Sequence, residues 1–172
     1  MPSPALVAGL SLVIVLLLML AELRLSQANE RRLRRDGAVE APDDVYEAMR
    51  WAYPGTFIVM AVEGMIWGPE PGWIAGLGAL VFTLAKLLKG WAIASLGPRW
   101  TYRVFVLPDA PLVTGGPYAV LRHPNYVAVA GELAGLALLV GARGSGPVGI
   151  AVFLWLLRRR IVVEERALGL RT

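Results

Sequence analysis

The sequence predicts an all-α integral membrane protein with about five transmembrane helices, with the N-terminus outside and the C-terminus in the cytoplasm. Hydrophobic residues make up 56% of the 172-residue chain and charged residues 17%, and soluble domains usually hold about a quarter charged residues. The apolar residues gather in long runs, as membrane helices require. Lysine and arginine fall in alternate loops between these runs, and this pattern indicates the orientation.

The first apolar run is "PALVAGLSLVIVLLLMLA", residues 4–21, and it carries no charge. A run of about 20 residues is long enough to cross the hydrocarbon layer. A signal peptide is the alternative, but the run lacks a positively charged start and a clear cleavage site of small residues. We therefore expect a membrane anchor, followed by a polar and partly helical stretch over residues 22–50.

Four further apolar segments follow. The second spans about 51–67 and contains Glu63, and a tight turn, "GPEPG", is expected over 68–72. The third covers 73 to about 96, the fourth about 125–140, and the fifth 147 to about 157, which continues as a charged helix. We expect a single domain over 1–172, with three helices in 1–95 and two in 96–172.

The basic residues set the orientation. Arginines crowd the first loop, the region from Lys86 to Arg122 and the C-terminal tail, whereas the second loop has none and the fourth has only Arg143. Positive loops stay in the cytoplasm, so "RHPNY" (122–126) and "EER" (164–166) are predicted on the same cytoplasmic face. The net charge of +4 then fits anionic lipid headgroups, and we expect no nucleic-acid partner.

The stretch "GPYAVLRHPNY" holds His123, the only histidine of the chain. Proline suits the first turn of a helix, so Pro124 should begin the fourth helix. The free N–H groups there favour an anion such as a carboxylate or phosphate. The alternative is an interfacial cap, with Arg122 reaching lipid phosphate and aromatic anchors at Tyr118 and Tyr126. The residues alone leave both open.

For the acidic residues, too, a structural and a functional interpretation are both possible. Glu164 and Glu165 follow three arginines and could simply pair along a solvated helix, for example with Arg160. They also lie on the predicted side of "RHPNY", where they would suit a cationic group. Glu132 is placed inside the apolar layer by its distance from Pro124, and Glu63 lies in the second apolar segment. For both, a structural pairing and a functional role remain open.

Several kinds of site are excluded. A chain without cysteine and with one histidine forms no disulfide and lacks the ligands of the usual zinc site, so no metal is expected. "GARGSG" lacks the preceding strand of a dinucleotide loop. Nothing supports a Ser-His-Asp triad around the histidine.

"GPYAVLRHPNYVAV", followed about forty residues later by "RIVVEERAL", resembles the isoprenylcysteine carboxyl methyltransferase family, and the upstream "LGPRWTYRVFVLPDAPLVTGGPY" resembles its bacterial branch. The likeness covers roughly residues 96–168 well, and residues 1–95 only in hydropathy. It implies an integral protein of the bacterial inner membrane that uses S-adenosylmethionine to methylate a lipophilic acceptor, which enters from the bilayer. The related eukaryotic enzymes continue beyond "EERAL", so we expect part of the acceptor pocket to be missing or supplied otherwise.

The resemblance also implies roles for particular residues. Cofactor contacts are carried over onto Gly116, Pro117, Tyr118, Arg122, His123, Pro124, Tyr126 and Glu164 or Glu165. For the acceptor, a carboxylate would need only orientation, by Arg159 or Arg160, whereas a phenol would benefit from a base, His123 or Glu132. We expect Glu132, because a carboxylate in an apolar layer should have a raised pKa.

Two alternatives differ in kind. Sterol reductases, which use NADPH, carry a similar "HPNY" stretch followed by an acid. The second alternative is a non-enzymatic scaffold whose basic loops bind anionic lipid. The acceptor and the oligomeric state are not determined by the sequence.

Overall fold

The computed structural model describes residues 3–42, 45–68, 72–108 and 110–170, and most of these residues are helical. The five α-helices are α1 (Pro4–Arg35), α2 (Tyr46–Trp67), α3 (Gly72–Leu96), α4 (Pro124–Val140) and α5 (Ser145–Ala167). Short 3₁₀ helices lie at η1 (Gly97–Arg99) and η2 (Gly116–Ala119), and β1 (Val39–Glu40) pairs antiparallel with β2 (Phe105–Val106). The expected "GPEPG" turn lies outside the described residues at 69–71.

The helix ends follow from local chemistry. The Ser3 hydroxyl accepts a hydrogen bond from the Leu6 N–H at the start of α1, where Pro4 occupies the first turn. Pro124 opens α4, as the sequence predicts, and Gly141 ends it in the left-handed conformation with φ of 75°. Because proline and glycine mark these ends, the expected segments agree closely with the observed helices.

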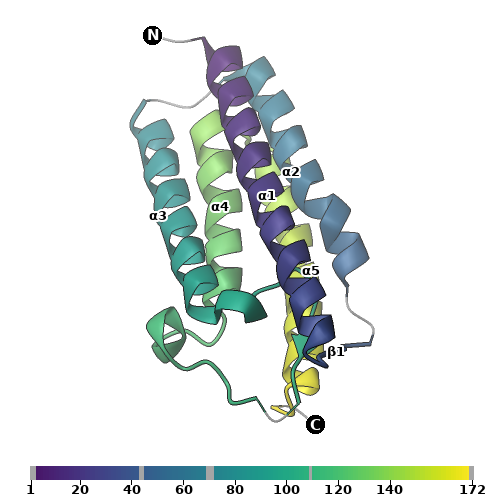
Figure 1. Cartoon of the computed structure of the whole chain (residues 1–172). Helices are drawn as coiled ribbons and strands as arrows, with labels where there is room; N and C mark the ends of the chain where they lie inside the picture. The colour runs from purple at the N-terminus through teal and green to yellow at the C-terminus, as the bar shows by residue number, and fades with distance from the viewer. Residues whose placement is uncertain (1–2, 43–44, 69–71, 109, 171–172) are drawn as a thin grey trace.

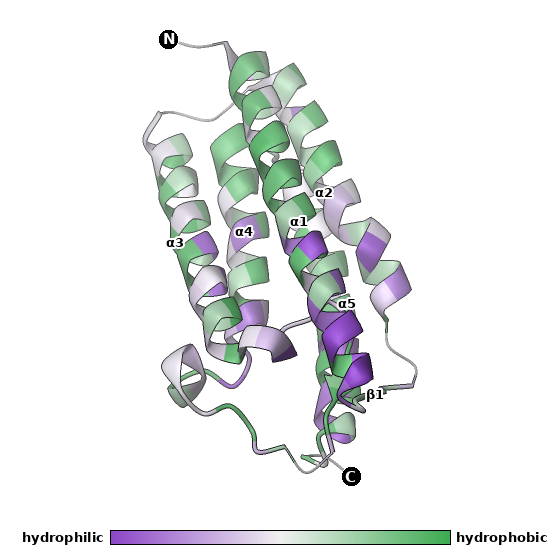
Figure 2. Ribbon diagram, in the orientation of Figure 1, coloured by the Kyte–Doolittle hydropathy of each residue, from purple (hydrophilic) through white to green (hydrophobic). Residues whose placement is uncertain are grey.

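The helices run alternately up and down, so that α2 and α4 start at the end where α1, α3 and α5 finish (Figure 1). The chain therefore begins and ends at opposite ends of the bundle. The connector between α3 and α4, described over residues 97–108 and 110–123, lies at the end where α5 finishes. Figure 2 shows that polar residues gather at this end, which we call the connector end, and apolar residues at the other.

Close packing of α3 on α4 fixes the register of the two helices. A Cβ on Gly135 would come within 2.5 Å of the Phe82 backbone nitrogen, and one on Gly78 within 2.4 Å of the Leu139 backbone nitrogen. Small residues permit this approach in membrane helices. One turn nearer the connector end, Gly131 packs on Ala85, and this register sets the lysines of α3 opposite Glu132.

The sides of the bundle are unusually apolar for a surface. Leu17 is 62% exposed, Ile66 69% and Leu87 65%, which fits contact with lipid. By length and composition, two helical stretches of the described chain are candidates to cross a membrane, Pro4–Arg35 and Gly72–Arg99, and α4 is a shorter apolar helix. The described residues form five α-helices, whereas five membrane spans and their orientation remain predictions.

Candidate active site

The polar residues of α4 and α5 meet at the connector end. His123 is the N-cap of α4, and its Nε2 lies 3.3 Å from Glu165 Oε1 of α5. Arg122 Nη1 lies 3.4 Å from the same oxygen. Tyr126 stacks on the His123 ring with 5.4 Å between centroids and donates its hydroxyl proton to Glu164. "RHPNY" and "EER" thus form one cluster, as the sequence predicts.

A cavity of about 540 Å³ lies between this cluster and the connector. We call it the connector cavity. Its lining comes from the connector, the start of α4 and the end of α5, and its polar and charged members include Arg99, Arg103, Thr114, Tyr118, Arg122, His123, Asn125, Tyr126, Arg160 and Glu164. Apolar walls come from residues such as Val113 and Leu168. The described lining therefore offers cationic groups, the Glu164 carboxylate and apolar surface together.

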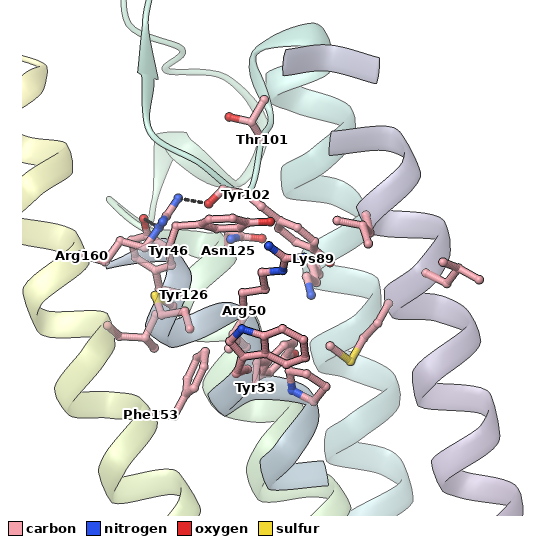
Figure 3. Close-up of a pocket in the computed structure, with 18 of the residues that line it drawn as sticks. Tyr46, Arg50, Tyr53, Lys89, Thr101, Tyr102, Asn125, Tyr126, Phe153 and Arg160 are labelled. Atoms are coloured by element: carbon pink, nitrogen blue, oxygen red, sulfur yellow. Dashed lines mark hydrogen bonds between the residues drawn. The ribbon is translucent and has the colours of Figure 1, made fainter. Parts of the chain in front are cut away.

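A second cavity of about 400 Å³ lies among the helices, and we call it the apolar cavity. Side chains of α1, α2, α4 and α5 form most of its walls, among them Leu16, Met19, Leu20, Leu23, Pro54, Val129, Phe153 and Leu157. Figure 3 shows the polar side chains that reach it, with Arg160 entering from α5 and Lys89 from α3. Such a cavity suits an elongated apolar ligand with a polar end.

The two cavities share one wall, which consists of Thr101, Asn125, Tyr126 and Arg160. Arg160 is 6% exposed and donates from Nε to the Tyr126 hydroxyl across 3.1 Å. The same guanidinium also donates to the Tyr102 carbonyl, drawn as the dashed line in Figure 3. Arginine presents several donors in a fixed plane, so these bonds hold its charge between the cavities.

A buried group of four charges lies beside the apolar cavity, and we call it the charge quartet. It comprises Glu22 of α1, Lys86 and Lys89 of α3 and Glu132 of α4. Lys86 Nζ lies 2.9 Å from Glu22 and 3.0 Å from Glu132, while Lys89 Nζ lies 2.6 Å and 3.4 Å from the same two acids. Tyr53 donates its hydroxyl proton to Glu132. Because the charges balance, burial of all four is tolerable.

The quartet changes the interpretation of Glu132. The expected role as a base depended on a carboxylate without partners in apolar surroundings. In the structure Glu132 is fully buried with two lysines and a tyrosine, and the described lining of neither cavity includes it. Its role as a base therefore loses its physical ground, and a structural pairing explains the residue.

Other predicted residues separate into two groups. Tyr118, Arg122, His123, Tyr126, Arg160 and Glu164 line the connector cavity. Gly116 instead packs on α3, where a Cβ would come within 2.2 Å of the Ser95 hydroxyl. The described lining of the connector cavity leaves out four of the predicted contacts: Gly116, Pro117, Pro124 and Glu165. Glu165 contacts the lining indirectly, because its carboxylate pairs with His123 and Arg122.

Two adjacent arginines of α5 differ in burial. Arg160 is buried between the cavities, whereas Arg159 is exposed and lies over the Trp155 ring at 5.1 Å. Successive helical residues point about 100° apart, so only one of them faces the interior. The sequence offered Arg159 or Arg160 to orient the acceptor, and of these two only Arg160 is in the described lining of the cavities.

Sequence reasoning missed several residues. Lys86 and Lys89 entered it only as topology signals, Asn125 entered it only through the "HPNY" stretch shared with sterol reductases, and Glu22 and Tyr102 were not considered as site residues. Lysines three residues apart in an apolar segment face the same way on a helix, which was the available signal. Burial, together with Glu22 nearby, raises the pKa of Tyr102, so its hydroxyl stays protonated and donates to Glu22 across 3.0 Å.

Glu63 has a structural explanation. Its carboxylate accepts hydrogen bonds from the backbone N–H groups of Gly144 and Ser145, at 2.8 and 2.7 Å, at the start of α5. An acid at a helix N-terminus satisfies free donors and complements the dipole.

A sequence profile of the isoprenylcysteine carboxyl methyltransferase (ICMT) family matches residues 77–169, more than half of the chain. The chain belongs to the ICMT family. The matched range includes the start of α4, the end of α5 and the lysines of the quartet, so the ICMT region contains the wall shared by the two cavities.

Two bacterial relatives carry names that state no activity. The "Uncharacterized protein YpbQ" of Bacillus subtilis is 29% identical over 86% of this chain and 88% of its own length. An "Uncharacterized protein" of Haemophilus influenzae is 34% identical over 55% of this chain and 54% of its own. No solved structure matches. The family is one of membrane methyltransferases, and the relatives agree with a bacterial branch.

Proposed function

We propose that this ICMT-family chain transfers a methyl group from S-adenosylmethionine to an oxygen of a lipophilic acceptor, at the cytoplasmic face of a bacterial inner membrane. The observation that carries the proposal is the wall of Thr101, Asn125, Tyr126 and Arg160 between a polar and an apolar cavity. A charged, water-soluble donor and an apolar acceptor must reach one reacting point from different surroundings. Two cavities that share a wall meet that need.

The connector cavity fits the chemistry of the donor. The amino-acid part of S-adenosylmethionine has a carboxylate and an ammonium group, and the cavity lining provides Arg122 and His123 for the first and Glu164 for the second. Its volume of about 540 Å³ is in the range of ligand pockets, roughly 300–1,000 Å³. Apolar residues such as Val113 and Leu168 offer surface for a flat ring. When bound, the cofactor supplies an electrophilic methyl group on a sulfonium.

The protein's own residues then act by positioning. Glu165 holds Arg122 and His123 in place at the mouth of α4. Arg160, fixed by Tyr126 and the Tyr102 carbonyl, places its charge where an acceptor oxygen would meet the shared wall. Holding two reactants in line contributes several kcal/mol to the rate, up to about 7–11 kcal/mol in favourable cases.

The acceptor is a lipophilic carboxylate or a phenol. A carboxylic acid ionises near pKa 4 and needs only orientation at neutral pH, whereas a phenol, with a pKa of about 10, must first lose its proton. The apolar walls from α1, α2 and α5 suit the hydrocarbon part in both cases.

The test is incubation of the purified full chain with a bacterial lipid extract and S-adenosylmethionine labelled in the methyl group, followed by mass analysis of the lipids. Label in a lipid fraction supports the proposal, and its absence from every lipid contradicts it. Thermal unfolding with S-adenosylhomocysteine or NADPH separates the rival cofactors, because a ligand that binds the folded state raises the midpoint. Stabilisation by NADPH alone would favour a reductase. If neither ligand stabilises the protein, a non-enzymatic scaffold is favoured.

A further inference from the structure

Helix α1 carries a stripe of polar residues that faces the connector. Glu22, Ser26 and Asn29 are three or four residues apart, so they lie on one side of the helix. Ser26 is fully buried and the other two are half-buried. All three precede the range 77–169 that matches the ICMT family, and none is in the described lining of either cavity. We therefore examined which parts of the site they hold.

Asn29 holds the backbone at the start of the connector. Its Nδ2 donates to the Trp100 carbonyl across 2.8 Å and to the Gly97 carbonyl across 3.3 Å. Trp100 is 2% exposed, and its ring Nε1 donates to Asn125 of the shared wall across 3.4 Å. An amide group of α1 therefore sets the position of a tryptophan that contacts the wall.

Ser26 holds the backbone two residues further on. Its hydroxyl oxygen accepts from the Tyr102 N–H across 2.8 Å, and the hydroxyl donates to Glu30 across 2.7 Å. The Tyr102 hydroxyl donates to Glu22 of the same stripe. The carbonyl of Tyr102 accepts from the Arg160 guanidinium, so a displacement of Tyr102 would move one of the groups that fix this arginine in the wall.

Thr101 lies between the two anchored residues and is itself a member of the shared wall. Its hydroxyl donates to the Arg103 carbonyl across 2.6 Å, so the same short segment sets the direction of its side chain. Bonds from α1 are thus linked to three of the four wall residues: Thr101 through the backbone, Asn125 through Trp100, and Arg160 through Tyr102.

We infer that Ser26 and Asn29 are positioning residues for methyl transfer, which hold residues 100–102 so that the shared wall aligns donor and acceptor. This rests on the proposed function, in which the wall separates the two reactants. Alignment of reacting groups is sensitive to small displacements, including those caused by residues remote from the chemistry. Loss of either anchor should therefore lower the rate of the chemical step.

Cofactor affinity should respond much less than the rate. The proposed contacts for the charged ends of the cofactor are Arg122, His123 and Glu164, which lie outside residues 97–102. A loss of alignment without a loss of binding lowers kcat and leaves the dissociation constant of the cofactor in place. This separation distinguishes a positioning role from a general role in folding.

The main experiment measures Ser26→Ala in the purified full chain, with labelled S-adenosylmethionine and a bacterial lipid extract. The replacement leaves the Tyr102 N–H without its partner, which is unfavourable for a buried donor. We expect the maximal rate to fall by roughly ten- to a hundredfold, and the affinity for S-adenosylhomocysteine to stay within about twofold of wild type. Ser26→Thr, which keeps a hydroxyl, should recover part of the rate.

Asn29→Asp is the second variant, and it gives the same test if Ser26→Ala fails to fold. The two side chains have nearly the same size, but a carboxylate replaces the amide donor and repels the carbonyls of Gly97 and Trp100. The maximal rate should fall in the same range, again with little change in affinity for S-adenosylhomocysteine.

Ser11→Ala is the matched control. It makes the same replacement on the same helix, at a residue that is in the described lining of neither cavity, and it should keep the wild-type rate. A double-mutant cycle with Arg160→Lys tests the route. If Ser26 acts through Tyr102 and Arg160, the double variant should be barely slower than Arg160→Lys alone.

Wild-type rates in both Ser26→Ala and Asn29→Asp overturn the inference. An equal loss of rate and cofactor affinity also overturns it, because both residues would then have a general structural role. Additive losses in the cycle with Arg160→Lys contradict the route through Tyr102.

Failure of the proposed function is a separate result. A wild-type protein that labels no lipid contradicts the methyltransferase, whereas hydrogen exchange of residues 100–104 tests the two anchors without any cofactor. Faster exchange there in Ser26→Ala and Asn29→Asp, but not in Ser11→Ala, supports the anchors. Unchanged exchange in the first two variants overturns them.

Discussion

Arg160 of α5 donates from Nε to the hydroxyl of Tyr126 of α4 across 3.1 Å, and both side chains border both cavities. The Tyr126 hydroxyl donates in turn to Glu164. One phenol group therefore connects the buried arginine to the carboxylate of the connector cavity. If methyl transfer occurs at the shared wall, this group is central to the positioning of the reactants.

Tyr126→Phe tests that position. The ring keeps its stacking on His123, but Arg160 and Glu164 lose a partner, and we expect the rate constant for methyl transfer to fall by roughly tenfold or more. Steady-state kinetics with labelled S-adenosylmethionine measures the change. Tyr118→Phe is the control, because Tyr118 lines only the connector cavity. Equal effects of the two replacements would contradict a special role for the shared wall.

His123→Ala and Glu165→Gln should each weaken cofactor binding while the protein remains folded. His123 lines the connector cavity and Glu165 orients His123 and Arg122, so we expect a loss of roughly ten- to a hundredfold in affinity. Isothermal titration with S-adenosylhomocysteine measures it. Arg159→Ala, which changes an exposed residue of α5, should bind normally. Unchanged affinity in both site variants would remove the cofactor from this cavity.

Glu132→Gln separates a structural role from a catalytic one. The replacement leaves Lys86 and Lys89 with one acid between them, and breaking a buried pair costs about 3–5 kcal/mol. Thermal unfolding in detergent should therefore show a clear loss of stability, whereas Glu47→Gln, at an exposed position, should not. The pH dependence of the residual methyl-transfer rate should keep its wild-type shape. A flattened profile would instead establish Glu132 as the base.

Glu40 makes the connector end sensitive to acid. Partial burial alone would raise its pKa, but hydrogen bonds and charge from Arg103 and Arg34 hold the pKa below its ordinary value of 4.5. A carboxyl whose pKa is lowered on folding stabilises the folded state above its unfolded pKa, and this contribution is lost as the pH falls through the folded pKa.

Below pH 4.5 the β1–β2 pairing should therefore loosen progressively. Hydrogen exchange of residues 39–41 between pH 6 and pH 3, read at matched intrinsic exchange rates, measures this. Glu40→Gln should exchange faster at pH 6 and show little further loss of protection towards pH 3. The same pH dependence in both proteins would show that other carboxyl groups cause it.

The orientation can be tested by cysteine labelling, because the native chain contains no cysteine. Arg35, at the end of α1, and Arg143, between α4 and α5, are both exposed and lie at opposite ends of the bundle. Alternating basic loops place Arg35 in the cytoplasm. Arg143→Cys should react with an impermeant maleimide in intact cells, and Arg35→Cys only after lysis. The reverse pattern would invert the topology.

The sequence by itself determined where the helices run. Pro124 fixes the start of α4 because it lacks the N–H that the first turn leaves without a partner, and Gly141 ends that helix because it adopts positive φ freely. It also predicted that "RHPNY" and "EER" would lie at the same end of the helices, because the basic loops alternate along the chain. These features depend on local chemistry and on the order of the segments.

Only the tertiary structure decided what each charged side chain faces. Sequence spacing does not distinguish Arg159 from Arg160. Because α4 packs beside α5, Arg160 is buried in the shared wall and Arg159 lies at the surface. Glu132 was an isolated acid in the sequence, and the glycine contacts between α3 and α4 bring two lysines to it. The partners of a buried charge come from other helices, so they are set by packing rather than by the neighbouring residues.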